Sequence, residues 1–167
     1  MIYRHQPDRG RYHQSLYDDD YCLKPPMLLW LALAFLSRGA LLPLLAGIGH
    51  YAHVNTDAMA LMRGLWRPDQ LFPALFAVPV LCSLMRRTPR AARPVRWIWQ
   101  RGRVLLAVAA ASDIALALYS LKSYGDFDGE AFVTLGACAA DAYFLLYVVL
   151  ARRIRDTFAD FPPPQSA

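Results

Sequence analysis

Residues 27–48, MLLWLALAFLSRGALLPLLAGI, form an apolar segment that contains a single charged residue, Arg38. A helix needs roughly 20 consecutive apolar residues to cross the hydrocarbon core of a bilayer, which is about 30 Å thick. The segment follows a polar stretch and is longer than the apolar core of a signal peptide. We therefore predict an uncleaved transmembrane helix over residues 27–48, with an arginine inside it.

Three further apolar segments follow, at residues 68–85, 103–122 and 131–151. The chain is 56% hydrophobic and 19% charged, whereas a soluble domain is about 45–50% apolar and about 25% charged. We predict an all-α fold, an integral membrane bundle of four transmembrane helices that occupies residues 25–155. Residues 1–24 are expected to form a cytoplasmic N-terminal segment, and residues 156–167 a flexible cytoplasmic tail.

The arginines and lysines are distributed unevenly between the two sides of such a bundle. Fourteen of them lie before the first span, in the loop 86–103 or after residue 151, and these three segments share one side of a four-span chain. Arg63, Arg67 and Lys122 lie in the two loops on the other side. Because positively charged loops stay on the cytoplasmic side, we place both termini in the cytoplasm.

The basic loop between the second and third predicted spans also contains two tryptophans. Arginine beside aromatic residues is found in proteins that bind single-stranded nucleic acid, but this loop is tethered between two spans, and tryptophan is enriched at membrane interfaces. Anionic headgroups attract such a segment by about 1 kcal/mol per basic residue. We therefore expect no nucleic-acid partner, and a surface for the anionic headgroups of the lipid bilayer formed by Arg86, Arg87, Arg90, Arg93, Arg96, Trp97 and Trp99.

The loop 49–69 contains a short segment with helical periodicity. Its apolar residues recur at the spacing of one helix face; they are Ala58, Leu61, Met62, Leu65 and Trp66. The segment is too short to span a bilayer, so we predict a short interfacial helix in this first outer loop.

Three charged residues fall inside the predicted spans: Arg38, Asp113 and Asp141. At a rise of about 1.5 Å per residue, each lies roughly 15–16 Å from one end of its span, close to the bilayer midplane. An isolated charge there costs about 2.5–3.5 kcal/mol, so one cluster of opposite charges is more favourable than three separate charges. We predict an intramembrane charge cluster whose role is structural, a partner-docking site, or part of a proton or ion pathway.

Small residues recur at four-residue spacing in the third and fourth predicted spans. Ala107 and Ala111 lie in one span, and Gly136 and Ala140 lie in the other. This spacing lets two helix backbones approach closely. The pattern predicts a helix-packing seam between the two spans, and it is equally compatible with homodimerisation.

The sequence contains no motif for catalysis or for cofactor binding. A Gly-rich phosphate loop, a nucleophile elbow and an HExxH pattern are all missing. His50 and His53 are three residues apart, but a zinc site needs three or four protein ligands. The cysteines, Cys22, Cys82 and Cys138, form no CxxC pattern. We therefore expect no enzymatic activity, no metal and no cofactor.

Residues 17–38, YDDDYCLKPPMLLWLALAFLSR, combine a Tyr/Asp-rich lead, Leu-Lys-Pro-Pro, a Leu-Trp start and a Phe-Leu-Ser-Arg end. This stretch resembles a bacterial inner-membrane family designated domain of unknown function 2919. The resemblance implies a small multi-pass protein of the bacterial inner membrane, and it implies no activity. Lys24, Pro25, Pro26 and Trp30 belong to the motif. Because proline opens helices readily, we predict that these four residues set the depth of the first span, and hence the depth of Arg38.

Two functions from different classes are compatible with these features. The first is an accessory or assembly subunit of a larger membrane complex, with a membrane-protein partner or a second copy of the chain beside it. The second is a small oligomeric transporter coupled to protons or ions, which would use the charge cluster. A dry and fully paired cluster of arginine and aspartate would argue against the transporter.

Overall fold

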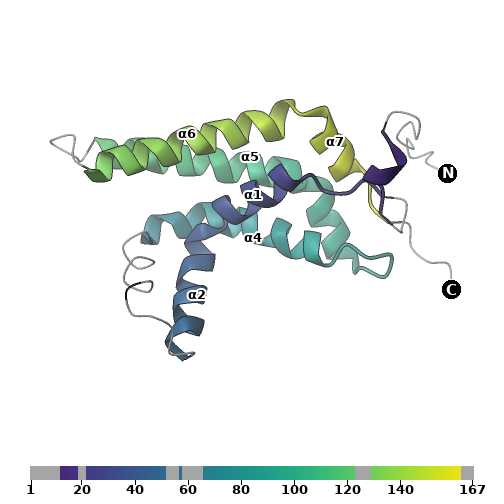
Figure 1. Ribbon diagram of the computed structural model, residues 1–167, viewed down its shortest axis with the longest axis horizontal. Helices are drawn as coiled ribbons and strands as arrows, with labels where there is room; N and C mark the ends of the chain where they lie inside the picture. Colours follow the sequence, from purple (N-terminus) through teal and green to yellow (C-terminus); the bar gives the residue numbers. More distant parts are fainter. Residues whose placement is uncertain (1–11, 19–21, 52–56, 58–65, 123–128, 163–167) are drawn as a thin grey trace.

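The computed structural model describes residues 12–18, 22–51, 57, 66–122 and 129–162, and this part of the chain is helical (Figure 1). The α-helices are α1 (Met27–Leu36), α2 (Arg38–Tyr51), α4 (Leu71–Met85), α5 (Arg93–Leu121), α6 (Gly129–Leu150) and α7 (Arg152–Ala159). Two 3-10 helices are described, η1 (Gln14–Leu16) and η2 (Pro68–Gln70). Among the described residues the only β-pairing is an isolated bridge between Tyr17 and Leu23. The predicted interfacial helix around residues 58–65 lies outside the described residues.

Three helical stretches are long and apolar enough to cross a membrane: Pro68–Met85, Arg93–Leu121 and Ala131–Leu150. They match the second, third and fourth predicted spans, except that α5 starts ten residues before the predicted residue 103 because the basic segment continues the same helix. α1 and α2 pass the same test only as a pair, and they meet at an angle of 76°. The described part of the chain therefore has three helices that could cross a membrane, or four if the bent pair is one span.

The first predicted span is broken at Ser37. The Ser37 backbone leaves the helical region (φ −88°, ψ 0°) after donating its N–H to the Leu33 carbonyl at 2.9 Å. Within α2, Pro43 has no N–H to offer the Gly39 carbonyl four residues earlier, and that carbonyl instead accepts a hydrogen bond from Trp66 Nε1 at 2.9 Å. The sequence pattern does not reveal the break, because apolar residues predominate on both sides of it.

Gly39 brings α2 against the start of α4. A β-carbon built on Gly39 would lie 2.1 Å from the backbone oxygen of Gln70 in η2, far closer than two atoms can pack. The backbones can meet at this point only because glycine has no side chain. Beyond the contact α2 projects away from the bundle (Figure 1), and its side chains Leu44, Leu45 and Ile48 are exposed.

α5 lies between α4 and α6, and α1 packs against α4 and α5 (Figure 1). The core between these helices is made of apolar side chains, among them Leu29, Leu33, Leu36, Ala77, Val80, Leu106, Ala109 and Val148. Other large apolar side chains point outward and are exposed, including Leu75, Phe132 and Leu150. An apolar outer surface on an apolar core is typical of helices surrounded by lipid.

A compact group of segments closes one end of the bundle (Figure 1). We call it the terminal cap and define it as residues 12–18, 22–26, α7 and residues 160–162. Trp99, near the start of α5, is fully buried against the cap. Its Nε1 donates to the carbonyls of Thr157 and Asp160 at 3.2 and 3.1 Å. Its ring centroid lies 4.7 Å from that of Phe158, so one side chain joins α5 to the last helix.

Asp160 and Arg87 connect the N-terminal segment to the rest of the cap. The Leu23 N–H donates to Asp160 Oδ2 at 2.7 Å. Arg87 donates from Nη1 to the Leu23 carbonyl at 2.8 Å and from Nη2 to the Asp160 carbonyl at 3.0 Å. Tyr12 Oη donates to Asp156 Oδ2 at 2.8 Å. Both described ends of the chain are therefore fixed to the same end of the bundle.

This arrangement differs from the flexible tail predicted for residues 156–167. Residues 156–159 belong to α7, and Thr157 and Phe158 are buried. Ile154, Thr157 and Phe158 follow the i, i+3, i+4 spacing of a helix face, a signal that is short and hidden beside the polar, proline-rich end. Residues 163–167 lie outside the described residues.

Candidate functional site

The structure brings the three charges of the predicted spans together at the break between α1 and α2. Arg38 is the first residue of α2, while Asp113 and Asp141 lie within α5 and α6. Arg38 Nη2 lies 2.7 Å from Asp113 Oδ2 and 3.7 Å from Asp141 Oδ2. One guanidinium group therefore faces carboxylates from two neighbouring helices. We call these three residues the charge cluster.

Arg38 is also bound to the end of α1. Its Nη1 donates to the Phe35 carbonyl at 3.1 Å, and its guanidinium carbon lies 4.0 Å from the centroid of the Phe35 ring. The last carbonyls of a helix have no intrahelical partner and carry partial negative charge. The same side chain therefore caps α1 where the helix breaks and pairs with Asp113 across the bundle.

The two carboxylates of the charge cluster have different surroundings. Asp113 has a short, charge-assisted contact to Arg38. Asp141 is 0% exposed, and neither of its carboxylate oxygens has a hydrogen-bond partner. Its 3.7 Å separation from Arg38 is too long for a hydrogen bond. Ser37 Oγ, at the break, is also buried without a partner. The charge cluster is therefore incompletely paired, with one formal positive charge and two negative ones.

The small residues predicted to form a helix-packing seam between α5 and α6 are not buried in the structure. Ala111 and Gly136 are exposed, and Ala140 is half-buried. A β-carbon built on Gly136 would meet nothing within 4 Å. α5 instead buries Ala109 and Ala110, which share a helix face with Asp113 and so allow the core helices to approach the charge cluster.

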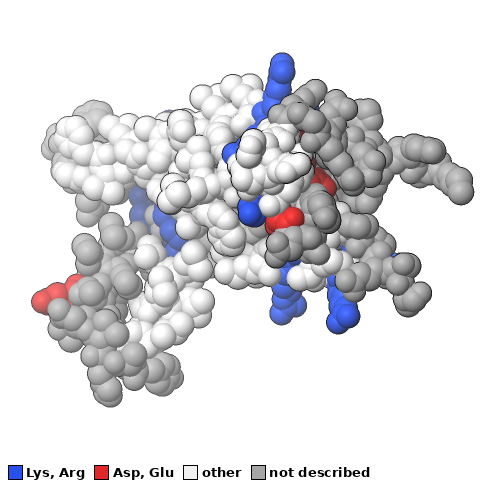
Figure 2. All heavy atoms as spheres, turned by 45° about the vertical axis from the view of Figure 1, so that its right-hand side comes forward, with Lys and Arg blue, Asp and Glu red and all other residues white. Residues whose placement is uncertain are grey.

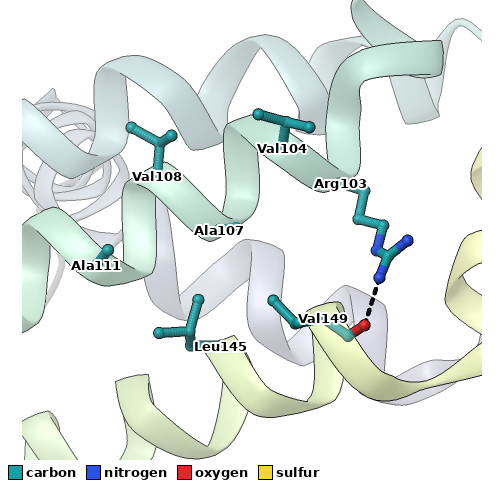
Figure 3. A pocket seen from close by; sticks show the side chains of 7 residues that line it. All are labelled: Arg103, Val104, Ala107, Val108, Ala111, Leu145 and Val149. Carbon is teal, nitrogen blue, oxygen red and sulfur yellow. Dashed lines mark hydrogen bonds between the residues drawn. The ribbon is translucent and has the colours of Figure 1, made fainter.

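Ala107 and Ala111 line a groove between α5 and α6 with a volume of about 460 Å³ (Figure 3). Its lining residues are Arg103, Val104, Ala107, Val108, Ala111, Leu145 and Val149. Arg103 lies at one end of the groove, where it donates from Nε to the Val148 carbonyl at 3.0 Å and from Nη2 to the Val149 carbonyl. The small residues thus leave an apolar groove on the surface of the bundle.

The residues predicted to face lipid headgroups fall into two groups. The first group is exposed and comprises Arg86, Arg90, Arg93 and Trp97. Arg101 stacks on Trp97, with 4.4 Å from the guanidinium carbon to the ring centroid. Figure 2 shows basic side chains that project outward from the molecule. This group is accessible to a charged surface.

The second group faces the protein instead, and it comprises Arg87, Arg96 and Trp99. Arg96 Nη2 donates to the Pro89 carbonyl at 2.9 Å, and its guanidinium carbon lies 4.9 Å from the Phe161 ring centroid. Trp99 is fully buried. These residues do not face lipid headgroups as predicted, because their N–H groups donate to backbone carbonyls of the folded chain. The sequence alone does not show that these carbonyls lie beside them.

α1 begins directly after Pro26, whose backbone is extended (φ −66°, ψ 148°). Pro25 is half-buried, Lys24 is exposed and Trp30 is 39% exposed. The break at Ser37 interrupts the straight helical path on which the depth estimate for Arg38 rests, so the positioning role of this motif stays a prediction.

The described residues include no group of three or more His, Cys, Asp or Glu side chains that could hold a metal ion. His53 lies outside the described residues. Cys22 is buried in the terminal cap, and burial together with the nearby Asp160 carboxylate raises the pKa of its thiol to about 12. Cys82 on α4 and Cys138 on α6 are also free thiols.

Comparison with known proteins assigns the chain to a family. A family model described as "Protein of unknown function (DUF2919)" matches residues 12–160, a range that contains every described helix and the whole charge cluster. No curated protein and no solved structure matches the chain significantly. Since the match extends over most of the 167 residues, the chain belongs to the DUF2919 family.

Proposed function

We propose that this protein is a non-enzymatic accessory or assembly subunit of a larger membrane complex in the bacterial inner membrane. The three or four candidate spans support a multi-pass arrangement. The fourteen basic residues in the segments on one side support cytoplasmic termini by the positive-inside rule. Both described ends of the chain meet in the terminal cap, which is compatible with termini on one side of the membrane.

The observation that carries this proposal is the position of α2. The helix leaves α1 at 76° and touches the bundle near Gly39. Farther along, Leu44, Leu45 and Ile48 are 59%, 48% and 57% exposed. α2 thus presents an apolar surface apart from the bundle, where a transmembrane helix of another protein could pack. Helices in membranes associate through such close van der Waals contacts.

Site-specific photocrosslinking in intact cells tests this proposal. A photoreactive phenylalanine analogue at Leu45 samples α2, and the same analogue at Leu146 samples an exposed apolar position of α6 as a matched control. We expect an adduct of defined mass with a different membrane protein from Leu45 and none from Leu146. Adducts from Leu45 to lipid alone, or only to a second copy of this chain, would contradict the proposed subunit role.

The topology is tested separately by reporter fusions. Alkaline phosphatase fused after residue 162 is active only when it is exported, whereas a fluorescent protein fused there matures in the cytoplasm. We expect fluorescence and no phosphatase activity. The opposite result would place the C-terminus outside and would contradict the topology without affecting the proposed partner.

A proton- or ion-coupled transporter is the second candidate, and the charge cluster favours it. Transporters commonly bind ions beside discontinuous helices, and here Asp141 is buried without a hydrogen-bond partner close to the break between α1 and α2. Proteoliposomes that enclose a pH-sensitive dye provide the test. Transport predicts dissipation of an imposed pH gradient by the wild type and its loss in Asp141→Asn. Equal rates in protein-free vesicles would remove this candidate.

A further inference from the structure

The charge cluster has an excess of negative charge and is buried inside the helix bundle. Arg38 contributes one positive charge, and Asp113 and Asp141 contribute two negative charges if both are ionised. The side chains of Asp113 and Asp141 are 8% and 1% exposed, so water cannot neutralise the difference. An uncompensated buried charge is very unfavourable, and two carboxyl groups that share a site do not readily ionise together. One additional positive charge is needed.

Each helix around the cluster can be searched for that charge. α1 and α4 contain no Asp, Glu, Lys or Arg, and the one thiol of α4, Cys82, is exposed. α2 contributes Arg38, and α5 contributes Asp113. The arginines of α5 lie ten or more residues before Asp113, and they are Arg93, Arg96, Arg101 and Arg103. On α6, Asp141 is followed by Tyr143 and Tyr147, which are neutral in their usual form. Among the described residues, Arg38 is the basic side chain that forms an ion pair with Asp113 and with Asp141, so the described chain supplies no second cation.

We propose that the charge cluster is a binding site for one exchangeable proton, which the Asp113 and Asp141 carboxyl groups share and which resides mainly on Asp141. Asp113 Oδ2 lies 2.7 Å from Arg38 Nη2, which is a short, charge-assisted contact. Asp141 lies beyond hydrogen-bond distance from Arg38, and neither of its carboxylate oxygens has a hydrogen-bond partner. The proton forms an O–H bond on one carboxylate oxygen, which gives a neutral acid and a cluster with no net charge.

The geometry favours a proton over a metal cation. A metal ion that prefers oxygen needs several ligands at once, whereas a proton needs a single oxygen atom. The Arg38 guanidinium, 3.7 Å from Asp141 Oδ2, would also repel a metal cation held on that oxygen. The proposal concerns occupancy by a proton, so it does not depend on a partner at α2 or on transport across the membrane.

Infrared spectroscopy of the full-length protein in nanodiscs tests the proposal by counting protonated carboxyl groups. The C=O band of a carboxylic acid is separate from the carboxylate bands, and isotope-labelled aspartate identifies the bands that come from aspartate. At neutral pH we expect one protonated aspartate per wild-type chain. Asp141→Asn should remove it. Asp113→Asn should remove it too, because the remaining carboxylate alone then balances Arg38.

Arg38→Gln gives the opposite expectation. Without the guanidinium both carboxyl groups lose their counter-charge, so we expect the count to rise from one protonated aspartate to two. Asp69→Asn is the matched control, since Asp69 pairs with Arg67 near the surface and should leave the count at one. If Arg38→Gln does not fold, the two single asparagine variants still test the proposal.

Three results would overturn the proposed proton site. The first is a wild-type spectrum with no protonated aspartate, and the second is a protonated aspartate that persists in Asp141→Asn. The third is loss of the band when choline in the buffer is replaced by sodium, which would identify a metal cation in the site. None of these results depends on crosslinking at Leu45, so failure of the proton site and failure of the proposed subunit role are separate outcomes.

Discussion

Arg38 Nη2 lies 2.7 Å from Asp113 Oδ2, which joins the first residue of α2 to α5. Through Nη1 the same guanidinium also caps the Phe35 carbonyl at the end of α1. The helix break and the charge cluster are therefore one structural unit, and a change in either is expected to affect the other.

Replacement of both aspartates should be far more damaging than replacement of either one. In Asp113→Asn or Asp141→Asn one carboxylate remains to balance Arg38, so each should lower the free energy of unfolding by no more than about 1.5 kcal/mol. The double variant leaves Arg38 buried without a counter-charge and should cost about 3–5 kcal/mol. Unfolding by SDS in mixed micelles measures all three. Additive effects would contradict a shared role for the two carboxylates.

Gly39→Ala should destabilise the contact between α2 and η2. The new methyl group would lie 2.1 Å from the Gln70 carbonyl oxygen, and overpacking of this kind costs about 1–3 kcal/mol. Gly47→Ala is the matched control on the same helix, because nothing lies within 4 Å of its β-carbon position. Alanine there should stabilise the helix by about 0.5–1 kcal/mol. The free energy of unfolding should therefore change in opposite directions, and a neutral Gly39→Ala would refute the close approach.

Trp99→Phe should loosen the terminal cap. The substitution removes the N–H that both the Thr157 and Asp160 carbonyls accept. The Asp160 carbonyl keeps its hydrogen bond from Arg87, but the Thr157 carbonyl loses its Trp99 donor, and a buried carbonyl left unpaired costs about 1–3 kcal/mol. Limited trypsin digestion should cleave faster after Arg153 or Arg155. Trp97→Phe provides the control, since Trp97 is 53% exposed. Equal digestion rates in the two variants would mean that Trp99 does not hold α7 in place.

Cys22 should react slowly with maleimide in the folded protein. Burial, followed by the negative charge of Asp160, raises the pKa of its thiol from 9.0 to about 12. Because the thiolate is the reactive form, labelling at pH 8 should be about a thousandfold slower than in the SDS-unfolded chain. Asp160→Asn should accelerate it. Fast labelling of the folded wild type would show that the segment around Cys22 does not pack against the rest of the terminal cap.

The raised pKa of the Cys22 thiol determines the direction in which stability changes with pH. The folded state binds the Cys22 proton more tightly than the unfolded state, so this contribution is complete below about pH 9 and is lost as the pH rises toward 12. Cys22→Ser should reduce the loss of stability over that alkaline range. An identical pH profile in the serine variant would exclude Cys22 as its source.

The described helices show which structural features of this protein can be predicted from sequence patterns. The segments that became α4, α5 and α6 were predicted from apolar length alone, because burial in a bilayer imposes a minimum number of apolar residues. The grouping of Arg38 with Asp113 and Asp141 follows from their similar depths in separate helices. The helix break at Ser37 could not be predicted in this way. A break depends on which neighbouring groups form hydrogen bonds with the backbone groups that it leaves unpaired.

The sequence by itself determined the helical class, the approximate limits of the long apolar helices and the set of charges that must be compensated within them. These properties depend on composition and on spacing along one chain. Only the tertiary structure decided that Trp99 and Arg87 face the terminal cap, that Gly136 lies on the surface, and that Asp141 is left without a hydrogen bond. These outcomes depend on contacts between residues far apart in the sequence, such as the 2.7 Å hydrogen bond from Leu23 to Asp160, and local periodicity carries no information about them.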